Sequence, residues 1–438
     1  VDCVFRGEGE ETYPQWLNCW QQPKEWTRIT GLCFLDAEGQ YHDNGLSRVM
    51  AFDKLVNPEQ SPFFNWSKPF VQLETTRGCF NTCAFCVSGG EKPVRTLSVA
   101  AIRERVRLIH EKGIRNIRVL ARTFNSQSHR AKALFDLFRE FPDMRFHLEI
   151  HPALLSEELK KELASMPKGL LHLEAGIQSL HEEVLTVSRR ASKLADALEG
   201  LRYLCALDNM ETHADLIAGL PLYHLSQIFD DVRTLAEYRA GEIQLESLKL
   251  LPGTEMRRRA EELGICYSPL PPYEVLQTRE ITPDELQTAR QLSRLLDGFY
   301  NAPAWQEITR RLIVEEPDFL TRFLNHLIQI GVIDQPMGLE RRGILLYHFC
   351  KEHYPHFLTA MSRAWIEAGR SLKKEPAERV RTKHVTPPEA WTVCMGTYRD
   401  NLRLCKLPAP EEGRCYWYGF ETESQQLRPV FAAVSEYI

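Results

Sequence analysis

Short apolar runs alternate with longer amphipathic runs along the middle of this chain, from about residue 70 to residue 250. The apolar runs have the length of buried strands, and the runs between them have the periodicity of helices. This alternation predicts parallel strands joined by crossover helices. Six strands are expected, beginning near Phe70, Ile114, Phe146, Leu170, Thr212 and Ile243.

The segment before this repeat has a different pattern. Residues 1–10 predict an apolar strand that ends in a glycine-rich turn, and residues 12–17 could begin a helix. A strand, a turn and a helix start make half of an α/β unit, which cannot bury its faces alone. Residues 28–69 are interpreted as a connector with a small hairpin around Asp36–Gly39.

The segment after the repeat is predicted to be mostly helical. Thr282 and Pro283 form a helix start, because threonine caps a helix amino terminus and proline fits its first turn. Amphipathic runs such as 319–333 follow. We therefore expect a core domain over 70–281 and a mostly helical carboxyl-terminal domain over 282–438.

Composition limits the classes of function. The chain has 438 residues, 43% of them hydrophobic and 26% charged, which suits two or three globular domains. A net charge of −5 gives no electrostatic case for nucleic-acid binding. No apolar run reaches the length of a membrane helix, and no secretory signal is recognised. The twelve cysteines do not form a disulfide scaffold, so a reducing, cytoplasmic compartment is expected.

Three of the cysteines follow the first predicted strand of the repeat. Cys79, Cys83 and Cys86 have the spacing C-x3-C-x2-C, and the next cysteine is Cys205. Three thiolates on one short loop suit a soft metal centre. A fourth would close a zinc or simple ferredoxin site. The alternatives from spacing alone are a zinc loop or three buried structural cysteines.

This motif, with Phe85 before its last cysteine, resembles the radical S-adenosylmethionine (SAM) superfamily. The resemblance implies a 4Fe-4S cluster on the three cysteines, whose open iron is chelated by SAM. It also implies reductive cleavage of SAM to a 5'-deoxyadenosyl radical, a flavodoxin- or ferredoxin-type electron donor and a small-molecule substrate. The implied fold is a partial (β/α)6 barrel of the TIM type, with its chemistry at the carboxyl ends of the strands.

Further strand-end motifs resemble the same superfamily. The run Glu174-Ala-Gly-Ile-Gln178-Ser is similar to its Glu-x-Gly-x-Gln-Ser signature, and Asp215-Leu-Ile-Ala-Gly-Leu-Pro to another strand-end motif. The resemblance implies cofactor contacts from the side chains of Phe85, Glu149, Glu174, Gln178, Arg190 and Asp215. Spacing does not separate Arg190 from Arg189, and a barrel-interior ion pair is an alternative role for Glu174. Gly89-Gly90-Glu91 follows the cysteines directly, so it is given no SAM role.

The first residues look like the last strand and loop of the cobalamin-binding domain that precedes many radical SAM cores. Residues 1–27 are therefore interpreted as the end of such a domain, most of which would lie before Val1. Its Asp-x-His-x-x-Gly motif is absent, and Ala121 stands where related sequences often have aspartate. The favoured function is a cobalamin-dependent radical SAM enzyme that methylates carbon or catalyses a radical rearrangement or cyclisation.

Two other hypotheses stay open. One is a cobalamin-free radical SAM enzyme, similar to the coproporphyrinogen-oxidising or methylthio-transferring branches. The other is a metal-binding scaffold without turnover. No residue is assigned to substrate contact.

Overall fold

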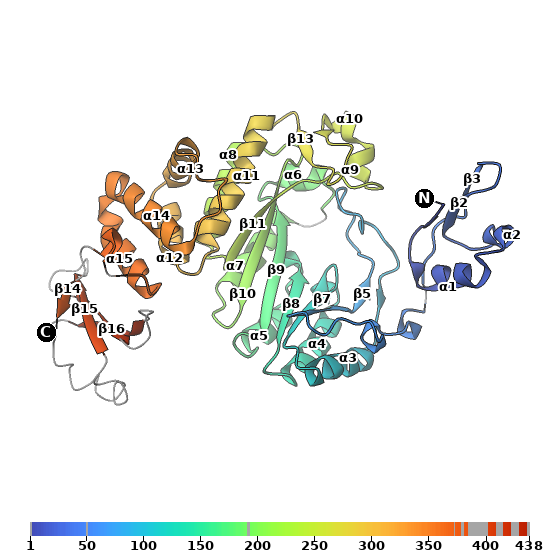
Figure 1. The fold of residues 1–438 in the computed structure, drawn as a ribbon, viewed down its shortest axis with the longest axis horizontal. Helices are drawn as coiled ribbons and strands as arrows, with labels where there is room; N and C mark the ends of the chain where they lie inside the picture. Colours follow the sequence, from blue (N-terminus) through green and yellow to red (C-terminus); the bar gives the residue numbers. More distant parts are fainter. Residues whose placement is uncertain are drawn as a thin grey trace. The chain divides into compact units, whose positions relative to one another are not determined.

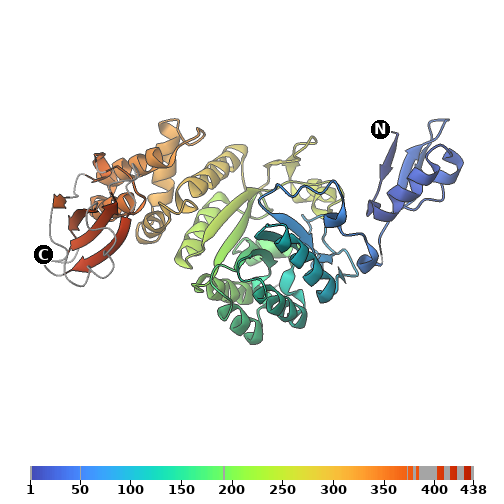
Figure 2. The same ribbon diagram turned by 60° about the horizontal axis from the view of Figure 1, so that its bottom comes forward.

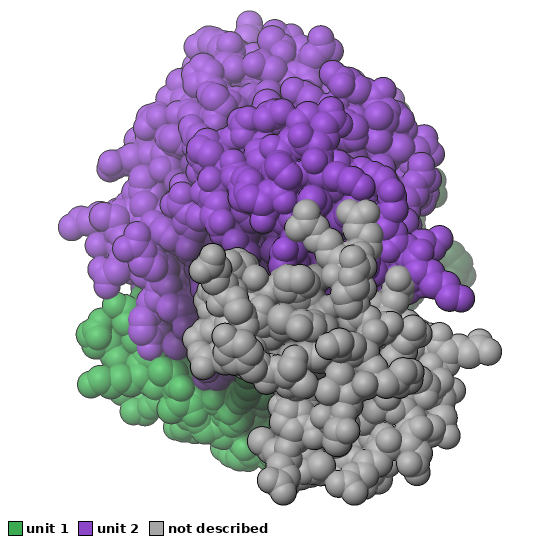
Figure 3. All heavy atoms as spheres, turned by 90° about the vertical axis from the view of Figure 1, so that its left-hand side faces the viewer, with its two compact units in different colours: residues 1–82, 88–150, 155–172 green, residues 83–87, 151–154, 173–438 purple. Residues whose placement is uncertain are grey.

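The structure, a computed structural model, describes residues 2–49, 51–190, 193–371 and 373–377, together with four strands within 381–435. Contacts divide the chain into two compact units (Figure 3). Unit 1 comprises residues 1–82, 88–150 and 155–172, and unit 2 comprises residues 83–87, 151–154 and 173–438.

The six predicted strands form one sheet in the order β11-β10-β9-β8-β7-β4, with β4 and β11 at its open edges (Figure 1). The pairs β4/β7, β7/β8 and β10/β11 are parallel. An open sheet in sequential order confirms the six predicted strands and is the sheet of a partial barrel. The strands are β4 (Val71–Glu74), β7 (Asn116–Leu120), β8 (Arg145–Ile150), β9 (Leu171–Gln178), β10 (Glu211–Ala218) and β11 (Glu242–Ser247).

In unit 1 the strands alternate between buried apolar and more exposed polar residues. In β8, Phe146, Leu148 and Ile150 are buried, while the residues between them are partly exposed. Because successive side chains in a strand face opposite sides, the sheet has one apolar face. Helices α3 (Val99–Glu111), α4 (Ser128–Arg139) and α5 (Glu157–Ala164) pack one against the next (Figures 1 and 2). The short strands β5 (Thr76–Arg77) and β6 (Arg95–Thr96) pair with each other in antiparallel orientation.

Unit 2 has the same alternation. In β9 the apolar residues Leu173, Ala175 and Ile177 are buried, and Glu174 and Gly176 lie on the opposite face. The face of β9 opposite these apolar residues therefore carries the Glu174 side chain. The helices of this part are α6 (Glu182–Val187), α7 (Leu194–Cys205) and α8 (Leu225–Glu237), followed by α9 (Glu255–Arg258), α10 (Ala260–Leu263), β12 (Cys266–Tyr267) and β13 (Val275–Gln277).

The first residues of the chain form a small lobe within unit 1. It contains β1 (Cys3–Phe5), α1 (Gly9–Cys19), α2 (Pro23–Trp26), β2 (Leu32–Leu35) and β3 (Tyr41–Asp43). The predicted hairpin is confirmed, since β2 and β3 pair antiparallel. However, β1 pairs antiparallel with β2, across the boundary predicted between residues 27 and 28. That boundary is wrong, because Ile29, Leu32 and Phe34 form the core against which the side chains of β1 and α1 pack.

The region after the sheet begins with the predicted helix. Thr282 caps α11 (Pro283–Leu295) in a capping box with Glu285. A π-helix (Leu296–Tyr300) and four helices follow: α12 (Gln306–Glu315), α13 (Phe319–Gln329), α14 (Leu339–His353) and α15 (Leu358–Glu367). The helical prediction is confirmed over 283–367. It is wrong beyond that, because β14 (Arg381–Lys383), β15 (Leu402–Pro408), β16 (Cys415–Glu421) and β17 (Pro429–Ser435) form an antiparallel sheet.

Candidate functional site

The cysteine loop starts at the end of β5, where a glycine precedes the first thiol. Gly78 has φ +87°, and a Cβ at this position would lie 2.6 Å from the carbonyl oxygen of Glu91. The amide of Cys79 donates to that same carbonyl over 3.1 Å. Only glycine permits this approach, which fixes the backbone of Cys79. The Glu91 carboxylate pairs with Arg95 at 3.1 Å, consistent with leaving Gly89-Gly90-Glu91 without a SAM role.

The second half of the loop belongs to unit 2. The amide of Ala84 donates to the carbonyl of Ser188, and the amide of Met256 donates to the carbonyl of Ala84, both over 2.8 Å. On either side of Ala84, Cys83 is buried, and Phe85 and Cys86 are partly buried. None of the nine cysteines whose side chains the structure describes, these three included, forms a disulfide.

Arg190 lies beside the buried thiol. Its Nη1 is 3.7 Å from Cys83 Sγ, and its Nη2 donates to the carbonyl of Gly176 in β9. A guanidinium next to a thiol favours the thiolate, which is the form that binds metal. Arg189 instead pairs with Glu255, and its side chain is 50% exposed. The structure thus places Arg190, and not its neighbour, at the cysteine loop.

Gln178 ends β9 in an unusual conformation. Its φ is +67°, a region that non-glycine residues rarely adopt. Its Oε1 atom is buried without a hydrogen-bond partner. A Cβ on Gly176 would lie 2.7 Å from the Gln178 amide nitrogen, so glycine leaves room for this side chain. A buried acceptor without a partner is a group that a bound ligand could satisfy.

A residue without any sequence motif holds the turn after Gln178. Asp231 in α8 accepts hydrogen bonds from the Tyr223 hydroxyl at 2.5 Å and from the Leu180 amide at 2.9 Å. His181 Nε2 lies 3.1 Å from its other oxygen. Burial raises the pKa of Asp231, while the hydrogen bonds from Tyr223 and Leu180 oppose that rise.

The predicted carboxylates lie on the polar side of their strands. Glu149 is the fifth residue of β8, in unit 1. In unit 2, Glu174 in β9 and Asp215 in β10 interact electrostatically with each other. Burial raises the pKa of Asp215, and the charge of Glu174 acts in the same direction, whereas His213 opposes it. His213 Nε2 lies 3.0 Å from Asp215 Oδ1.

His151 and Asp231 carry no role predicted from the sequence. His151 follows β8 and is 3% exposed. Burial and the charge of Arg190 lower its pKa to about 4, so it is neutral at physiological pH. Gly200 of α7 packs on the adjacent Pro152, where a Cβ would meet the proline carbonyl oxygen at 2.1 Å. The sequence signal for His151 is its place at a strand end before a proline, and Asp231 has none.

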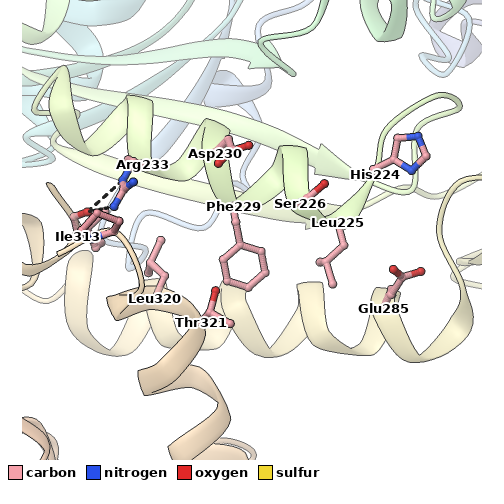
Figure 4. Close-up of a pocket in the computed structure, with 11 residues that line it drawn as sticks. His224, Leu225, Ser226, Phe229, Asp230, Arg233, Glu285, Ile313, Leu320 and Thr321 are labelled. Atoms are coloured by element: carbon pink, nitrogen blue, oxygen red, sulfur yellow. Dashed lines mark hydrogen bonds between the residues drawn. The ribbon is translucent and has the colours of Figure 1, made fainter. Parts of the chain in front are cut away.

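The described cavities lie elsewhere. In unit 2, a groove of about 510 Å³ lies along α8, with Phe229 between Leu225 and Leu320, with Glu285 near one end and with Arg233 and Ile313 near the other (Figure 4). In unit 1, a groove of about 780 Å³ is lined by residues of the small lobe, including Trp26, Phe34 and His42. No residue predicted for the cluster or for SAM lines either groove.

Three histidines in α14 and just after it each contact a different charged side chain. His348 pairs with Glu375, and His356 pairs with Glu316. His353 Nδ1 accepts a hydrogen bond from Arg322. Since these side chains have separate partners, the stretch does not form a metal-ligand cluster within the described residues.

The residues of the loop and of β9 fit an iron-sulfur cluster with bound SAM. Within unit 2, Cys83 and Cys86 offer thiols outside any disulfide, Arg190 lies beside Cys83, and Gln178 offers a buried acceptor without a partner. Cys79, in unit 1, is the third cysteine of the sequence motif. Among the described helices, none is both long enough and apolar enough to cross a bilayer.

Comparison with solved structures finds a similar fold. The cobalamin-dependent S-adenosylmethionine radical enzyme OxsB, with aqua-cobalamin and S-adenosylmethionine bound, matches with a TM-score of 0.54 at 14% identity. The match covers 83% of this chain and 62% of that chain.

Curated relatives match over shorter spans. Hopanoid C-3 methylase of Methylococcus capsulatus is 27% identical over 214 residues, 47% of this chain and 41% of that protein. A tRNA-2-methylthio-N(6)-dimethylallyladenosine synthase of Herpetosiphon aurantiacus is 27% identical over 213 residues, 44% of this chain and 47% of that protein. The aligned regions span less than half the length of each relative.

Family models match two segments. The protein of unknown function family DUF4080 matches residues 261–361, and the radical SAM superfamily matches residues 73–235, which include the three cysteines and β4 through most of α8. Over residues 73–235, the chain therefore has the sequence of the radical SAM superfamily.

Proposed function

We propose that this protein is a cobalamin-dependent radical SAM enzyme that transfers a methyl group to carbon or catalyses a radical rearrangement or cyclisation. The observation that carries this proposal is the likeness to OxsB, which extends over 83% of the chain, beyond the radical SAM segment. The similarity to hopanoid C-3 methylase gives weaker support for methyl transfer.

The chain's own residues would share the work at the cysteine loop. Cys79, Cys83 and Cys86 would hold three irons of a 4Fe-4S cluster and leave the fourth for SAM. When bound, these cofactors supply one-electron cleavage of the sulfonium to a 5'-deoxyadenosyl radical. Arg190 would pair with the carboxylate of SAM, because a guanidinium fork matches two oxygens. Gln178 would accept a hydrogen bond with its buried amide oxygen.

The carboxylates would orient the rest of SAM. Glu149, Glu174 and Asp215 can accept hydrogen bonds from hydroxyl or ammonium groups at the ends of their strands. His151 is neutral near Arg190, so it does not compete with the guanidinium for an anion. Substrate contacts are not assigned to any residue.

Anaerobic reconstitution tests the proposal. We expect about four irons per chain and release of 5'-deoxyadenosine after reduction with dithionite, with both lost in a Cys79, Cys83 and Cys86 triple alanine variant. Hydroxocobalamin should change its visible spectrum when it is titrated into protein expressed from the whole reading frame, because most of the expected cobalamin-binding domain would lie before Val1. SAM cleavage by that protein without any cobalamin binding would contradict the cobalamin-dependent part.

A methylthio-transferring enzyme is the second candidate. A specific observation favours it, since a tRNA-2-methylthio-N(6)-dimethylallyladenosine synthase of Chlorobium luteolum is 32% identical over 158 residues. The net charge of −5 argues against a tRNA substrate. Gel-shift titration with unmodified tRNA at low salt decides between the two: binding favours this candidate, and its absence favours the first.

A further inference from the structure

Three neighbouring strands of the sheet repeat one short pattern. Strand β8 contains His147-Leu-Glu149, β9 contains His172-Leu-Glu174, and β10 contains His213-Ala-Asp215. Side chains two residues apart in a strand face the same side. Each strand therefore presents a histidine and, one step nearer its carboxyl end, a carboxylate. The superfamily motifs include the carboxylates and give no reason for the histidines.

In unit 1 the histidines are held by polar contacts. The rings of His147 and His172 lie 4.8 Å apart, edge to face. The guanidinium of Arg145 lies 3.1 Å from His172 Nδ1. Since arginine only donates, Nδ1 of His172 accepts this hydrogen bond.

In unit 2, His213 contacts a carboxylate directly. Its side chain is 6% exposed, and its Nε2 lies 3.0 Å from Asp215 Oδ1. Its Nδ1 lies 4.0 Å from Glu242 Oε2 in β11. The charged or titratable groups that face it in unit 2 are thus Asp215, Glu242 and, through its charge, Glu174. Asp297 of the π-helix interacts in turn with Glu242.

The state of Asp215 depends on this histidine. Burial and Glu174 favour its neutral form, in which one oxygen carries the proton and acts as a donor. Burial would also lower the pKa of His213, but the close contact of its Nε2 with Asp215 and the charges of Asp215, Glu242 and Glu174 outweigh it and raise that pKa. A protonated His213 therefore offsets part of the negative charge and opposes the rise in the pKa of Asp215.

We propose that His213 is a positioning residue that holds the Asp215 carboxylate ionised and oriented for hydrogen bonds from SAM. This inference rests on SAM binding at Asp215, which is part of the proposed function. His213 itself would not touch SAM, because it lies nearer the amino end of β10 than Asp215.

The sign of the pH effect follows from the direction of the His213 shift. Its pKa is raised, so the protonated form that supports Asp215 is present at low and neutral pH and is lost as the pH rises through the folded-state value. SAM affinity should therefore fall on the alkaline side in the wild-type protein.

The test is anaerobic calorimetry of SAM binding to cluster-loaded protein between pH 6 and 9, together with kcat and KM for 5'-deoxyadenosine release. For His213→Ala we expect a Kd about tenfold higher, as for the loss of one charge-assisted hydrogen bond. The alkaline fall in affinity should also disappear. KM should rise while kcat changes little. His213→Asn, which donates a hydrogen bond but cannot be charged, should recover part of the affinity without the pH dependence.

A double-mutant comparison checks that the effect passes through Asp215. His213→Ala combined with Asp215→Asn should be no worse than Asp215→Asn alone. Additive losses, or unchanged affinity and pH profile in His213→Ala, would overturn the proposal.

His129→Ala, at an exposed histidine of α4, is the control. If His213→Ala fails to load iron, the SAM affinity and pH profile of His213→Asn alone decide whether the proposal holds. Protein expressed from the whole reading frame that cleaves SAM but binds no cobalamin would refute the proposed class and leave this inference intact.

Discussion

Two consecutive arginines illustrate how one residue can be distinguished from its neighbour. Arg190 contacts Cys83 and the backbone of β9, whereas Arg189 forms an exposed ion pair with Glu255. Arg190→Ala should lower kcat/KM for SAM cleavage by about 10- to 100-fold, the worth of charge-assisted hydrogen bonds to a carboxylate. Arg189→Ala should leave kcat/KM and the urea midpoint near their wild-type values, because exposed ion pairs contribute little. Equal losses in the two variants would contradict the assignment of Arg190.

Gln178 should show opposite effects on stability and on binding. It holds a left-handed backbone and a buried amide oxygen without a partner, both of which are costly in the protein without ligand. Gln178→Gly accepts the backbone conformation and removes the buried oxygen. We expect a urea midpoint at or above wild type and SAM affinity weakened by about tenfold. A variant that loses stability but keeps SAM affinity would refute this reading.

At the scale of elements, the turn after β9 is fixed by a helix that is distant in sequence. Asp231 of α8 holds Leu180 through its backbone amide, and Tyr223 supports Asp231. Tyr223→Phe leaves the buried Asp231 with one donor fewer, which should lower the free energy of unfolding by about 1–3 kcal/mol.

Urea denaturation of the apoprotein measures this loss. Tyr238→Phe is the matched control. The guanidinium of Arg202 lies over the ring of Tyr238, and phenylalanine keeps that ring. The Tyr223 variant should also raise the KM for SAM, since Gln178 precedes the turn. Identical midpoints for the two phenylalanine variants would rule out a structural role for the Tyr223 hydroxyl.

At the scale of the whole molecule, the small amino-terminal lobe is joined to the rest of unit 1 by ion pairs. Glu8 accepts hydrogen bonds from Arg95 at 2.8 Å and from the Val49 amide at 2.6 Å, and it lies 3.3 Å from Arg77. Burial would raise the pKa of Glu8, but the Arg95 and Val49 hydrogen bonds and the arginine charges outweigh it and hold that pKa below its usual value.

Because the pKa of Glu8 is lowered, its ionised carboxylate stabilises the docked lobe at pH values above the unfolded-state pKa of about 4.3. This stabilisation is lost as the pH falls through the folded-state pKa. Hydrogen exchange of the apoprotein should therefore show residues 2–49 losing protection at acidic pH before the sheet does. Glu8→Gln should lose that protection already at pH 7, whereas Glu11→Gln, at an exposed position, should not. Equal protection in both variants would exclude Glu8 as the anchor.

The sequence was most informative where local patterns repeat. The six strands, the capped helix at Thr282 and the helices to residue 367 follow from periodicity and capping, which depend on neighbouring residues alone. The predicted lobe boundary at residue 27 was wrong, because β1 pairs with β2, which lies beyond that boundary in the sequence. The antiparallel sheet at the carboxyl end was missed for the same reason. The roles of the predicted SAM contacts stay predictions.

By itself the sequence determined the superfamily, since the cysteine spacing and the strand-end motifs are local and the family model covers them. It also determined which residues could carry the chemistry. Only the tertiary structure decided which arginine lies beside Cys83, that Asp231 supports the turn after Gln178, and that His213 contacts Asp215. The physical reason is that burial and hydrogen bonding depend on segments brought together from distant parts of the chain, and these set the charge and orientation of each side chain.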